Sequence, residues 1–182
     1  MKVLIVVDMQ KDFIDGALGT KEAEAIVKNV VKRIGKANDE LVLFTLDTHQ
    51  TDYLDTPEGK KLPVIHCVEG SEGWQLNEEI RQAWLAQPDR HIVPELTENA
   101  FKKAVFGSLD LVDFLKNKQD EISEIEIIGV CTDICVLSNA IMIKNTLPHI
   151  PISVDSSCCA GVTPKSHQEA LSVMKMCHID VF

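Results

Sequence analysis

Residues 125–136 read IEIIGVCTDICV, and this stretch combines a short apolar run with a group of reactive side chains. The run Ile125–Val130 is rich in Ile and Val, which is typical of a strand buried on both faces of a parallel sheet. After a tight turn we expect a helix over Ile134–Lys144, entered at about Asp133. The stretch therefore predicts a strand–turn–helix unit, the repeating element of α/β sheets.

The same order of strand and helix recurs on both sides of this stretch. Further strands are expected at Val3–Val7, Leu41–Leu46, Ile92–Val93, Ile152–Val154 and His178–Val181. Further helices are expected at Glu22–Lys36 with Thr20 as N-cap, at Asn77–Leu85, at Ser108–Lys116, and at Pro164–Cys177 with Thr163 as N-cap. The predicted fold class is α/β, doubly wound in three layers with a parallel sheet and right-handed crossovers. Residues 1–182 are expected to form a single domain.

Composition narrows the range of partners. Hydrophobic residues make up 45% of the chain and charged residues 25%, as in ordinary globular proteins, which excludes a disordered chain and a coiled coil. The 18 basic and 28 acidic side chains give a net charge of −10, so a nucleic-acid backbone would be repelled. We expect no nucleic-acid partner and favour a small neutral or cationic ligand.

The N-terminal run and the cysteines indicate the compartment. Val3–Val7 is too short for a signal-peptide core or a membrane span, so no membrane partner is expected. The six cysteines show no CxxC spacing and no pattern of a small disulfide scaffold. We therefore expect a reduced, cytoplasmic protein.

Two reactive side chains lie where strands are expected to end. Asp8 closes the first strand, where a cap of the following turn is the alternative interpretation. Cys135 falls in the first helical turn, where free N–H groups and the helix dipole favour a thiolate and an oxyanion. Cysteine often only fills space in a core, and that interpretation suits Cys158, Cys159 and Cys177, which have no such setting.

A third candidate lies in the segment FKKAVFGSLDL, residues 101–111, which is interpreted as an apolar turn before a helix. Lys102 is expected to be a solvated surface residue. Lys103 beside a catalytic carboxylate would orient that carboxylate or polarise a substrate carbonyl.

The region from Asp47 to Trp74 has no convincing helix or strand, and a loop of this length in a compact domain is usually functional. It begins at the carboxyl end of a strand, where open α/β sheets bind ligands. It contains Asp47 and His49, then Glu58, then His66, an open set of nitrogen and oxygen donors. Such donors suit Zn²⁺ best, and Fe²⁺ or Mn²⁺ would also fit.

Three motifs in this order resemble those of the isochorismatase-like cysteine hydrolases, and especially of nicotinamidases. They are Asp8-x-Gln-x-Asp-Phe13, Lys103-x-x-Phe-Gly-Ser108 and Gly129-Val-x-Thr-Asp-x-Cys135-Val, with Asp47-x-His49 and His66-Cys-Val-x-Gly70 between them. The resemblance covers essentially the whole chain. It implies a six-stranded parallel sheet and a catalytic triad of Asp8, Lys103 and Cys135.

The resemblance also implies the surroundings of the triad. Asp47, His49 and His66 fall where nicotinamidases bind a divalent metal, and Glu58 aligns with a fourth acidic ligand of some members. A cis peptide is implied at Val130–Cys131, with the N–H groups of Cys131 and Cys135 as the oxyanion hole. Phe13 and Val130 are the expected substrate-binding residues, and family members commonly form homo-oligomers.

The expected function is therefore metal-dependent hydrolysis of nicotinamide to nicotinate and ammonia, in NAD salvage, through a thioester on Cys135. Two departures from nicotinamidases concern the pocket: Leu62–Ile65 reads LPVI before the third metal ligand, and Val105–Ser108 reads VFGS after the lysine. An alternative substrate is another small amide, carbamoyl or ureido compound. A second alternative is a non-catalytic binding protein with this fold, in which Cys135 would have no role. A third is a flavodoxin-like binding module, which lacks support because no Gly-rich phosphate loop follows the first strand.

Overall fold

A computed structural model describes residues 1–87 and 99–182. Its centre is a six-stranded, all-parallel sheet with the strand order β3-β2-β1-β4-β5-β6. The strands are β1 (Lys2–Val7), β2 (Glu40–Asp47), β3 (Ala100–Lys103), β4 (Glu124–Val130), β5 (Ile152–Ala160) and β6 (Asp180–Val181). The six-stranded parallel sheet is as expected.

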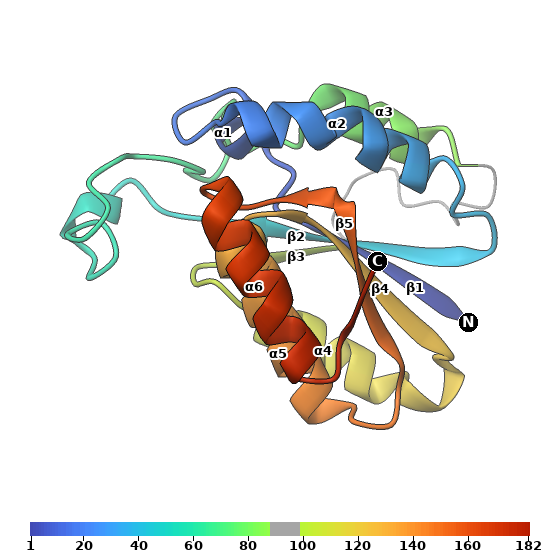
Figure 1. Cartoon of the computed structure of the whole chain (residues 1–182). Helices are drawn as coiled ribbons and strands as arrows, with labels where there is room; N and C mark the ends of the chain where they lie inside the picture. The colour runs from blue at the N-terminus through green and yellow to red at the C-terminus, as the bar shows by residue number, and fades with distance from the viewer. Residues whose placement is uncertain (88–98) are drawn as a thin grey trace.

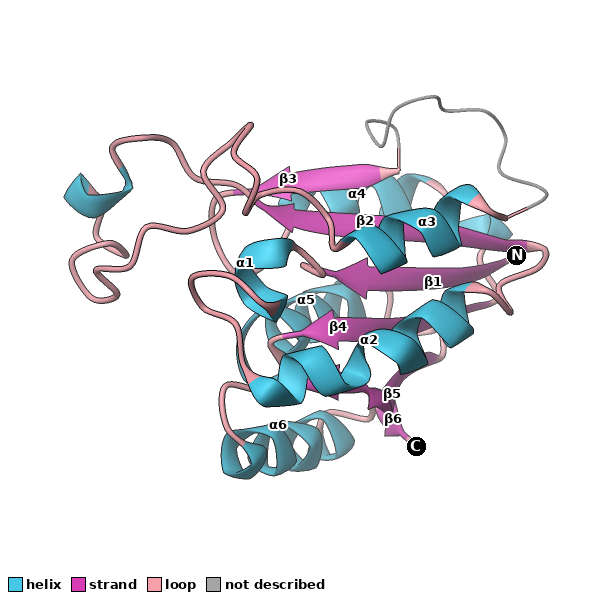
Figure 2. Ribbon diagram, turned by 90° about the horizontal axis from the view of Figure 1, so that it is seen from above, coloured by secondary structure: helices cyan, strands magenta, loops and turns pink. Residues whose placement is uncertain are grey.

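Helices cover both faces of this sheet (Figures 1 and 2). The helices are α1 (Lys11–Ile14), α2 (Lys21–Ile34), α3 (Glu78–Leu85), α4 (Leu109–Asn117), α5 (Leu137–Thr146) and α6 (Pro164–Met176). Helices α2 and α3 lie on one face, and α4, α5 and α6 lie on the other. Short 3₁₀ turns lie at Tyr53–Asp55 and Gln119–Glu121, and a π-helical turn lies at Thr132–Val136.

Strand β1 shows why the sheet needs two helical layers. Its residues alternate between two hydrophobic cores: Val3, Ile5 and Val7 face the α4–α6 layer, and Leu4 and Val6 face the α2–α3 layer. All five are essentially inaccessible to solvent, because both sides of a parallel sheet are covered. The continuous apolar run that predicted a doubly covered strand is explained by this alternation.

The predicted helix caps are confirmed. The Thr20 hydroxyl accepts a hydrogen bond from the N–H of Ala23, and the Asn77 side chain accepts one from Glu79. Thr163 and Ser166 form a capping box around Pro164 at the start of α6. These caps satisfy N–H groups that would otherwise lack partners at the helix starts.

Two expectations on strands need correction. The segment at Phe101–Lys103 was predicted to be a turn, and it is part of β3, an edge strand of four residues. Two adjacent lysines conceal it, because Lys102 faces solvent and Lys103 faces the interior on the opposite side of the pleat. Strand β5 continues to Ala160, well beyond Val154. The expected strand Ile92–Val93 lies outside the described residues.

Candidate active site

The carboxyl ends of the central strands bring three charged side chains together. Asp8 directly follows β1, Asp47 is the last residue of β2, and Lys103 is the last residue of β3. These strands are neighbours in the sheet, so their ends meet at the edge where α/β proteins bind ligands. Each of the three side chains is buried.

Lys103 is the centre of this group. Its Nζ lies 2.7 Å from Asp8 Oδ2 and 3.1 Å from Asp47 Oδ1, and it donates a hydrogen bond of 3.5 Å to Cys135 Sγ. One buried cation therefore contacts two carboxylates and a thiol. Burial alone would lower the pKa of Lys103, but the adjacent Asp8, Cys135 and Asp47 raise it well above its ordinary value. Lys103 is a fixed positive charge here.

Asp8 is held in one orientation. The Thr45 hydroxyl, on the neighbouring strand, donates a 2.7 Å hydrogen bond to Asp8 Oδ1 while Lys103 occupies Oδ2. Burial raises the pKa of Asp8 above its ordinary value, and the charge of Lys103 works against that rise. A carboxylate whose pKa is raised is better suited to take up and return a proton.

The third member, Cys135, lies in the turn that follows β4. Thr132–Val136 forms a single π-helical turn that runs directly into α5. The expected helix entry at about Asp133 is confirmed. Its first turn is π-helical and therefore wider than an α-helical turn. The Val130–Cys131 peptide is cis, as the resemblance implied. Gly129, with φ of 121°, allows β4 to approach β1, because a Cβ there would lie 2.1 Å from the Val7 carbonyl oxygen.

The protonation of Cys135 differs from the expectation. The helix start was expected to favour a thiolate, yet burial and the adjacent Asp8 raise the pKa of this thiol well above its ordinary value, and the charge of Lys103 offsets this only in part. The sulfur is 7% exposed as a residue and directed at charged groups. The Cys135 thiol thus lies beside a carboxylate, Asp8, that works against its ionisation, and beside Lys103, whose charge favours it.

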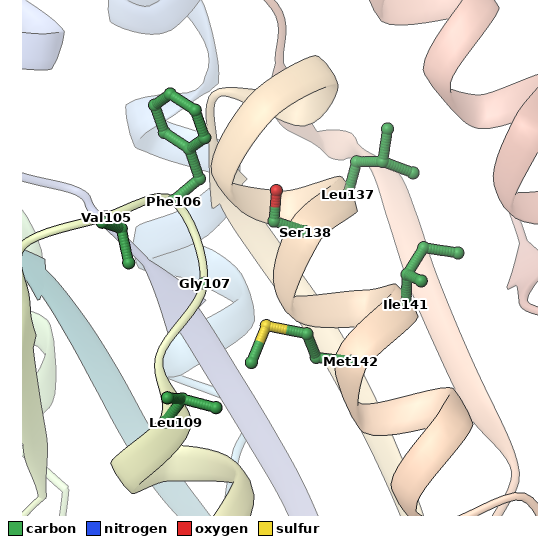
Figure 3. Close-up of a pocket in the computed structure, with 8 residues that line it drawn as sticks. All are labelled: Val105, Phe106, Gly107, Leu109, Leu137, Ser138, Ile141 and Met142. Atoms are coloured by element: carbon green, nitrogen blue, oxygen red, sulfur yellow. The ribbon is translucent and has the colours of Figure 1, made fainter. Parts of the chain in front are cut away.

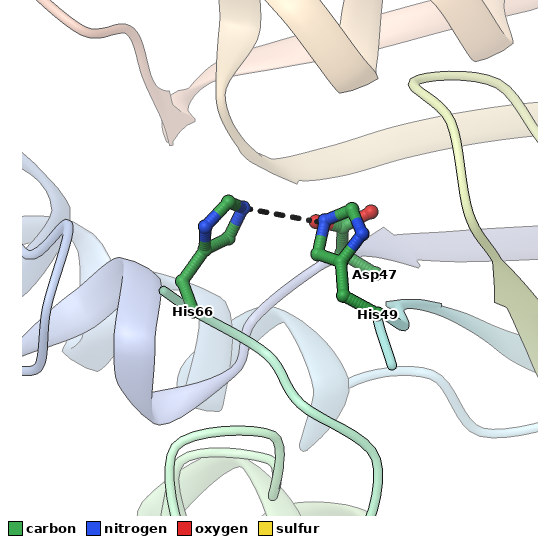
Figure 4. A group of neighbouring side chains, drawn as sticks. All are labelled: Asp47, His49 and His66. Atoms are coloured by element: carbon green, nitrogen blue, oxygen red, sulfur yellow. Dashed lines mark hydrogen bonds and ion pairs between the residues drawn. The ribbon is translucent and has the colours of Figure 1, made fainter. Parts of the chain in front are cut away.

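A second group, the metal group, consists of Asp47, His49 and His66 (Figure 4). One donor atom from each lies within 4.8 Å of the others, and all three residues are buried. Asp47 Oδ2 lies 3.0 Å from His49 Nε2 and 3.5 Å from His66 Nε2. Two imidazoles and a carboxylate are a donor set that Zn²⁺ and similar ions accept.

The details of the metal group also fit an ion. The Nδ1 of His66 lies 2.7 Å from the Val64 carbonyl oxygen, which leaves Nε2 free to act as a ligand, the usual arrangement around a bound metal. Burial works to raise the pKa of Asp47, but hydrogen bonds from His49 and His66 and the charge of Lys103 hold that pKa below its ordinary value. Asp47 is thus an ionised carboxylate with one oxygen toward Lys103 and the other toward the histidines.

The other expected site residues lie around these groups. Phe13 contacts the His66 ring edge-on, with 5.5 Å between ring centroids. Glu58 is partly exposed and lies outside the close group of three, but its charge is near enough to raise the pKa of His66. Cys131 follows the cis bond, and Val130 is buried in the core on the α2–α3 side. Lys102 is exposed at the surface, as expected, and pairs with Glu69.

Two residues of the site were not identified from the sequence. Tyr53 is buried, with its ring 4.5 Å from the His49 ring and 4.9 Å from the His66 ring, and its hydroxyl donates to the Leu62 carbonyl. Gln10 donates to the carbonyls of Asp47 and Trp74 and accepts from the Asp47 N–H. The motif Asp8-x-Gln contains Gln10, whereas nothing in the sequence distinguishes Tyr53 from an ordinary loop tyrosine.

An open apolar surface pocket of about 530 Å³ lies between the β3–α4 loop and α5 (Figure 3). It is lined by Val105, Phe106, Gly107, Leu109, Leu137, Ser138, Ile141 and Met142. The lining, taken from the part of the chain that the structure describes, includes no member of the two groups above. This pocket is therefore separate from the candidate chemistry.

Fold and site together define a three-layer α/β domain with a buried Asp–Lys–Cys cluster beside a candidate metal site. Residues 2–181 match the isochorismatase domain, and the chain belongs to that family. Within the family it is a nicotinamidase/pyrazinamidase-like hydrolase, of the amidohydrolase class.

Individual relatives cover nearly all or all of the chain. An uncharacterized isochorismatase family protein of Bacillus subtilis is 29% identical over 176 residues, which are 94% of this chain and 92% of the relative. The pyrazinamidase/nicotinamidase of Streptococcus mutans is 28% identical, with a TM-score of 0.82 and full coverage of both chains. The pyrazinamidase of Pyrococcus horikoshii, solved in complex with zinc, is 25% identical with a TM-score of 0.78, covering 100% of this chain and 98% of that one.

Proposed function

We propose that this chain hydrolyses nicotinamide to nicotinate and ammonia through a thioester on Cys135, a reaction that would serve NAD salvage. The observation that carries the proposal is the contact of one buried lysine with Asp8, with Cys135 and, through Asp47, with the metal group. The likeness to the pyrazinamidase/nicotinamidase of Streptococcus mutans over both full chains supports the choice of substrate.

The proposed catalytic residues are Asp8, Lys103 and Cys135. Asp8 removes the proton from the Cys135 thiol as the sulfur attacks the amide carbonyl, because Lys103 contacts both groups and the pKa of the Asp8 carboxyl is raised by burial. Asp8 then gives the proton to the departing ammonia, and a water activated by the same carboxylate cleaves the thioester. Lys103 stays charged throughout and holds Asp8 and the sulfur in place.

The N–H groups of Cys131 and Cys135 are the proposed oxyanion hole, since both belong to the turn that presents the sulfur. Phe13 is the proposed contact for a flat ring, because its side chain lies against His66 at the metal group. Val130 is the proposed neighbour of the substrate at the end of β4, with its side chain directed into the core.

We further propose that Asp47, His49 and His66 hold a divalent cation, Zn²⁺ in the first instance and Fe²⁺ or Mn²⁺ otherwise, with Glu58 as a fourth ligand. When bound, the cation would supply a Lewis-acidic position for the pyridine nitrogen of the substrate. The zinc complex of the similar Pyrococcus horikoshii pyrazinamidase supports this assignment. The chain's own part is to hold the ring while the amide faces Cys135.

The remaining proposals concern the whole molecule. We propose one catalytic domain over residues 1–182, a cytoplasmic location and self-association into homo-oligomers. The six free cysteines are in keeping with a reducing compartment. Among the described residues, none of the helices has the length and apolar character needed to cross a membrane. Sedimentation velocity of the purified chain tests the self-association.

An ammonia-release screen of the purified protein tests the function. Nicotinamide would be compared with pyrazinamide and with small aliphatic amides, carbamoyl and ureido compounds, and metal content would be measured on the same sample. We expect nicotinamide to be turned over fastest. If the protein hydrolyses another amide and not nicotinamide, the proposed substrate is wrong and the proposed thioester mechanism still holds. Such a difference in substrate would arise at the LPVI segment before His66.

A further inference from the structure

Asn139, on α5 one turn after Cys135, is a fully buried polar residue whose amide contacts two separate segments of the chain. Its Nδ2 donates hydrogen bonds to the Cys135 carbonyl at 2.8 Å and to the Phe106 carbonyl at 3.2 Å. Its Oδ1 accepts a hydrogen bond from the N–H of Ser108 at 3.0 Å. One side chain therefore joins the turn of the candidate nucleophile to the loop that follows Lys103.

This link spans a gap that the sheet leaves. Lys103 ends β3 and Cys135 follows β4, and in the strand order β3-β2-β1-β4 two other strands lie between them. No strand ladder joins their backbones directly, yet Lys103 Nζ and Cys135 Sγ lie within 3.5 Å of each other. A direct connection between the two segments is needed to fix that distance closely.

A second contact lies beside the first. Gly107, in the same loop, approaches α5 so closely that a Cβ there would lie 2.2 Å from Met142 Sδ. Figure 3 shows the loop running along this part of α5, with Phe106 and Leu109 on one side and Ser138 and Met142 on the other. The loop is thus held to α5 by the Asn139 amide, and Gly107 lies against the Met142 side chain.

We propose that Asn139 is a positioning residue, which sets the separation of Lys103 and Cys135 by clamping loop 104–108 to α5. The inference rests on the proposed function in one respect: it takes the Lys103–Cys135 contact to be part of the catalytic machinery. The loss of this buried amide is costly, because it removes the hydrogen-bond partner of the buried Ser108 N–H together with the side-chain bonds to the Cys135 and Phe106 carbonyls.

Two substitutions separate clamping from local support of the turn. Asn139→Leu has similar volume and makes none of the three hydrogen bonds. In Asn139→Ser the hydroxyl can still donate to the carbonyl four residues earlier, that of Cys135, but cannot reach the loop. If clamping matters, both variants lose activity to a similar degree.

Asn145→Leu is the matched control. Asn145 lies on the same helix and its Nδ2 also donates to the carbonyl four residues earlier, that of Ile141, at 2.9 Å. It is exposed and has no contact with the loop among the bonds of the described residues. This variant should behave as wild type.

The first measurement is steady-state hydrolysis of nicotinamide. We expect kcat to fall about 10- to 100-fold in Asn139→Leu and Asn139→Ser, with KM changed by less than about threefold, because a misplacement near 1 Å is enough for such a loss. The second measurement is the rate of iodoacetamide labelling of Cys135 across pH, read by peptide mass spectrometry against the exposed Cys177. We expect the Cys135 profile to move to higher pH in both variants as Lys103 moves away from the sulfur.

Labelling of the buried Cys159 in the same samples reports unfolding, so a fall in activity from loss of the fold would be recognised. A folded Asn139→Ser protein with wild-type kcat and a wild-type Cys135 profile overturns the clamp, whether or not Asn139→Leu folds. If wild-type protein does not hydrolyse nicotinamide, the proposed function fails, while the labelling profiles still decide on the clamp.

Discussion

Asp8, Lys103 and Cys135, here called the catalytic cluster after their proposed role, are joined to the metal group by the contact of Lys103 with Asp47. The two groups are built on different kinds of backbone. Asp8 and Lys103 stand at the ends of β1 and β3, and Cys135 stands in the turn after β4, so all three follow directly on regular strands. The metal group takes only Asp47 from a strand. His49 and His66 belong to a long connection in which the only regular element is the 3₁₀ turn Tyr53–Asp55.

The connection that carries His49 and His66 is held by hydrogen bonds of its backbone. The N–H of His49 donates to the Cys67 carbonyl and the N–H of Glu69 donates to the His49 carbonyl, each at 2.9 Å. The N–H of Cys67 donates to Asp12 Oδ2 at 2.8 Å. These bonds stabilise the loop locally, so damage to the metal group is expected to remain local. Damage at a strand end affects the core as well.

The largest effect is expected for Cys135→Ala, which acts on the catalytic cluster alone. Removing the nucleophile should lower kcat by at least about a thousandfold, because no other group near Lys103 can form the thioester. Metal content and the thermal midpoint of unfolding should stay near wild type, since the metal group does not use this sulfur. Turnover within tenfold of wild type would contradict the assignment of the nucleophile.

Lys103→Met is the substitution that should affect both regions. It leaves Asp8 and Asp47 buried without the cation that lies between them, and removing one partner of a buried ion pair costs about 3–5 kcal/mol. We expect a loss of unfolding free energy of that size, measured by urea denaturation, together with a loss of activity. The exposed Lys102→Met is the control, and it should change stability by less than about 1 kcal/mol. Equal stability of the two variants would contradict the central role of Lys103.

His49→Ala should affect the metal group and spare the catalytic cluster. We expect bound metal, measured by elemental analysis, to fall to a small fraction of that in wild type and KM for nicotinamide to rise about tenfold or more. Labelling of Cys135 by iodoacetamide should keep its wild-type pH profile, because Lys103 and Asp8 are untouched. Undiminished metal content in this variant and in His66→Ala would refute the site.

The same contrast explains what the sequence could and could not reveal. The apolar runs predicted the sheet and its two helical layers, because strands covered on both faces have a distinct composition. The motif residues at strand ends were identifiable because parallel strands bring their ends together. The short edge strand at Lys103 was concealed by its lysine pair, since only the register with β2 determines that one lysine faces inward.

The contacts of Tyr53 and Asn139 could not be predicted either. Both act through three-dimensional neighbours from other segments, Tyr53 through two histidine rings and Asn139 through a loop some thirty residues earlier. For Cys135 the position could be predicted, but the protonation of the thiol could not. Its place at a helix start was predicted, but the burial and the adjacent carboxylate that raise the pKa of its thiol depend on packing.

A moderate effect is expected where an aromatic ring supports the metal group. Tyr53→Leu removes the ring that contacts both His49 and His66 and should weaken metal binding about 10- to 100-fold, as loss of groups that orient ligands usually does. Tyr53→Phe keeps the ring and loses only the hydrogen bond to the Leu62 carbonyl, so it should lie within a few-fold of wild type. Competition with a chromophoric chelator measures both affinities, and equal affinities would show that the ring has no positioning role.

The smallest and most discriminating effect is the pH dependence of stability in metal-stripped protein, because the two carboxylates differ in sign. The pKa of Asp47 is lower in the folded than in the unfolded chain, so its stabilising contribution is present above the unfolded value, about 3.9, and is lost as pH falls below it. The pKa of Asp8 is raised by burial, so its contribution is present below that value and is lost as pH rises through the folded pKa.

Urea unfolding of Asp47→Asn and Asp8→Asn between about pH 3 and pH 8 separates these contributions. Asp47→Asn should lose less stability than wild type at the acid end, because the group that the unfolded chain protonates first is gone. Asp8→Asn should lose less stability than wild type as pH rises, because a buried carboxyl no longer has to ionise. Parallel curves for all three proteins would mean that folding shifts the pKa of neither carboxyl, and they would contradict the opposite signs expected for Asp47 and Asp8.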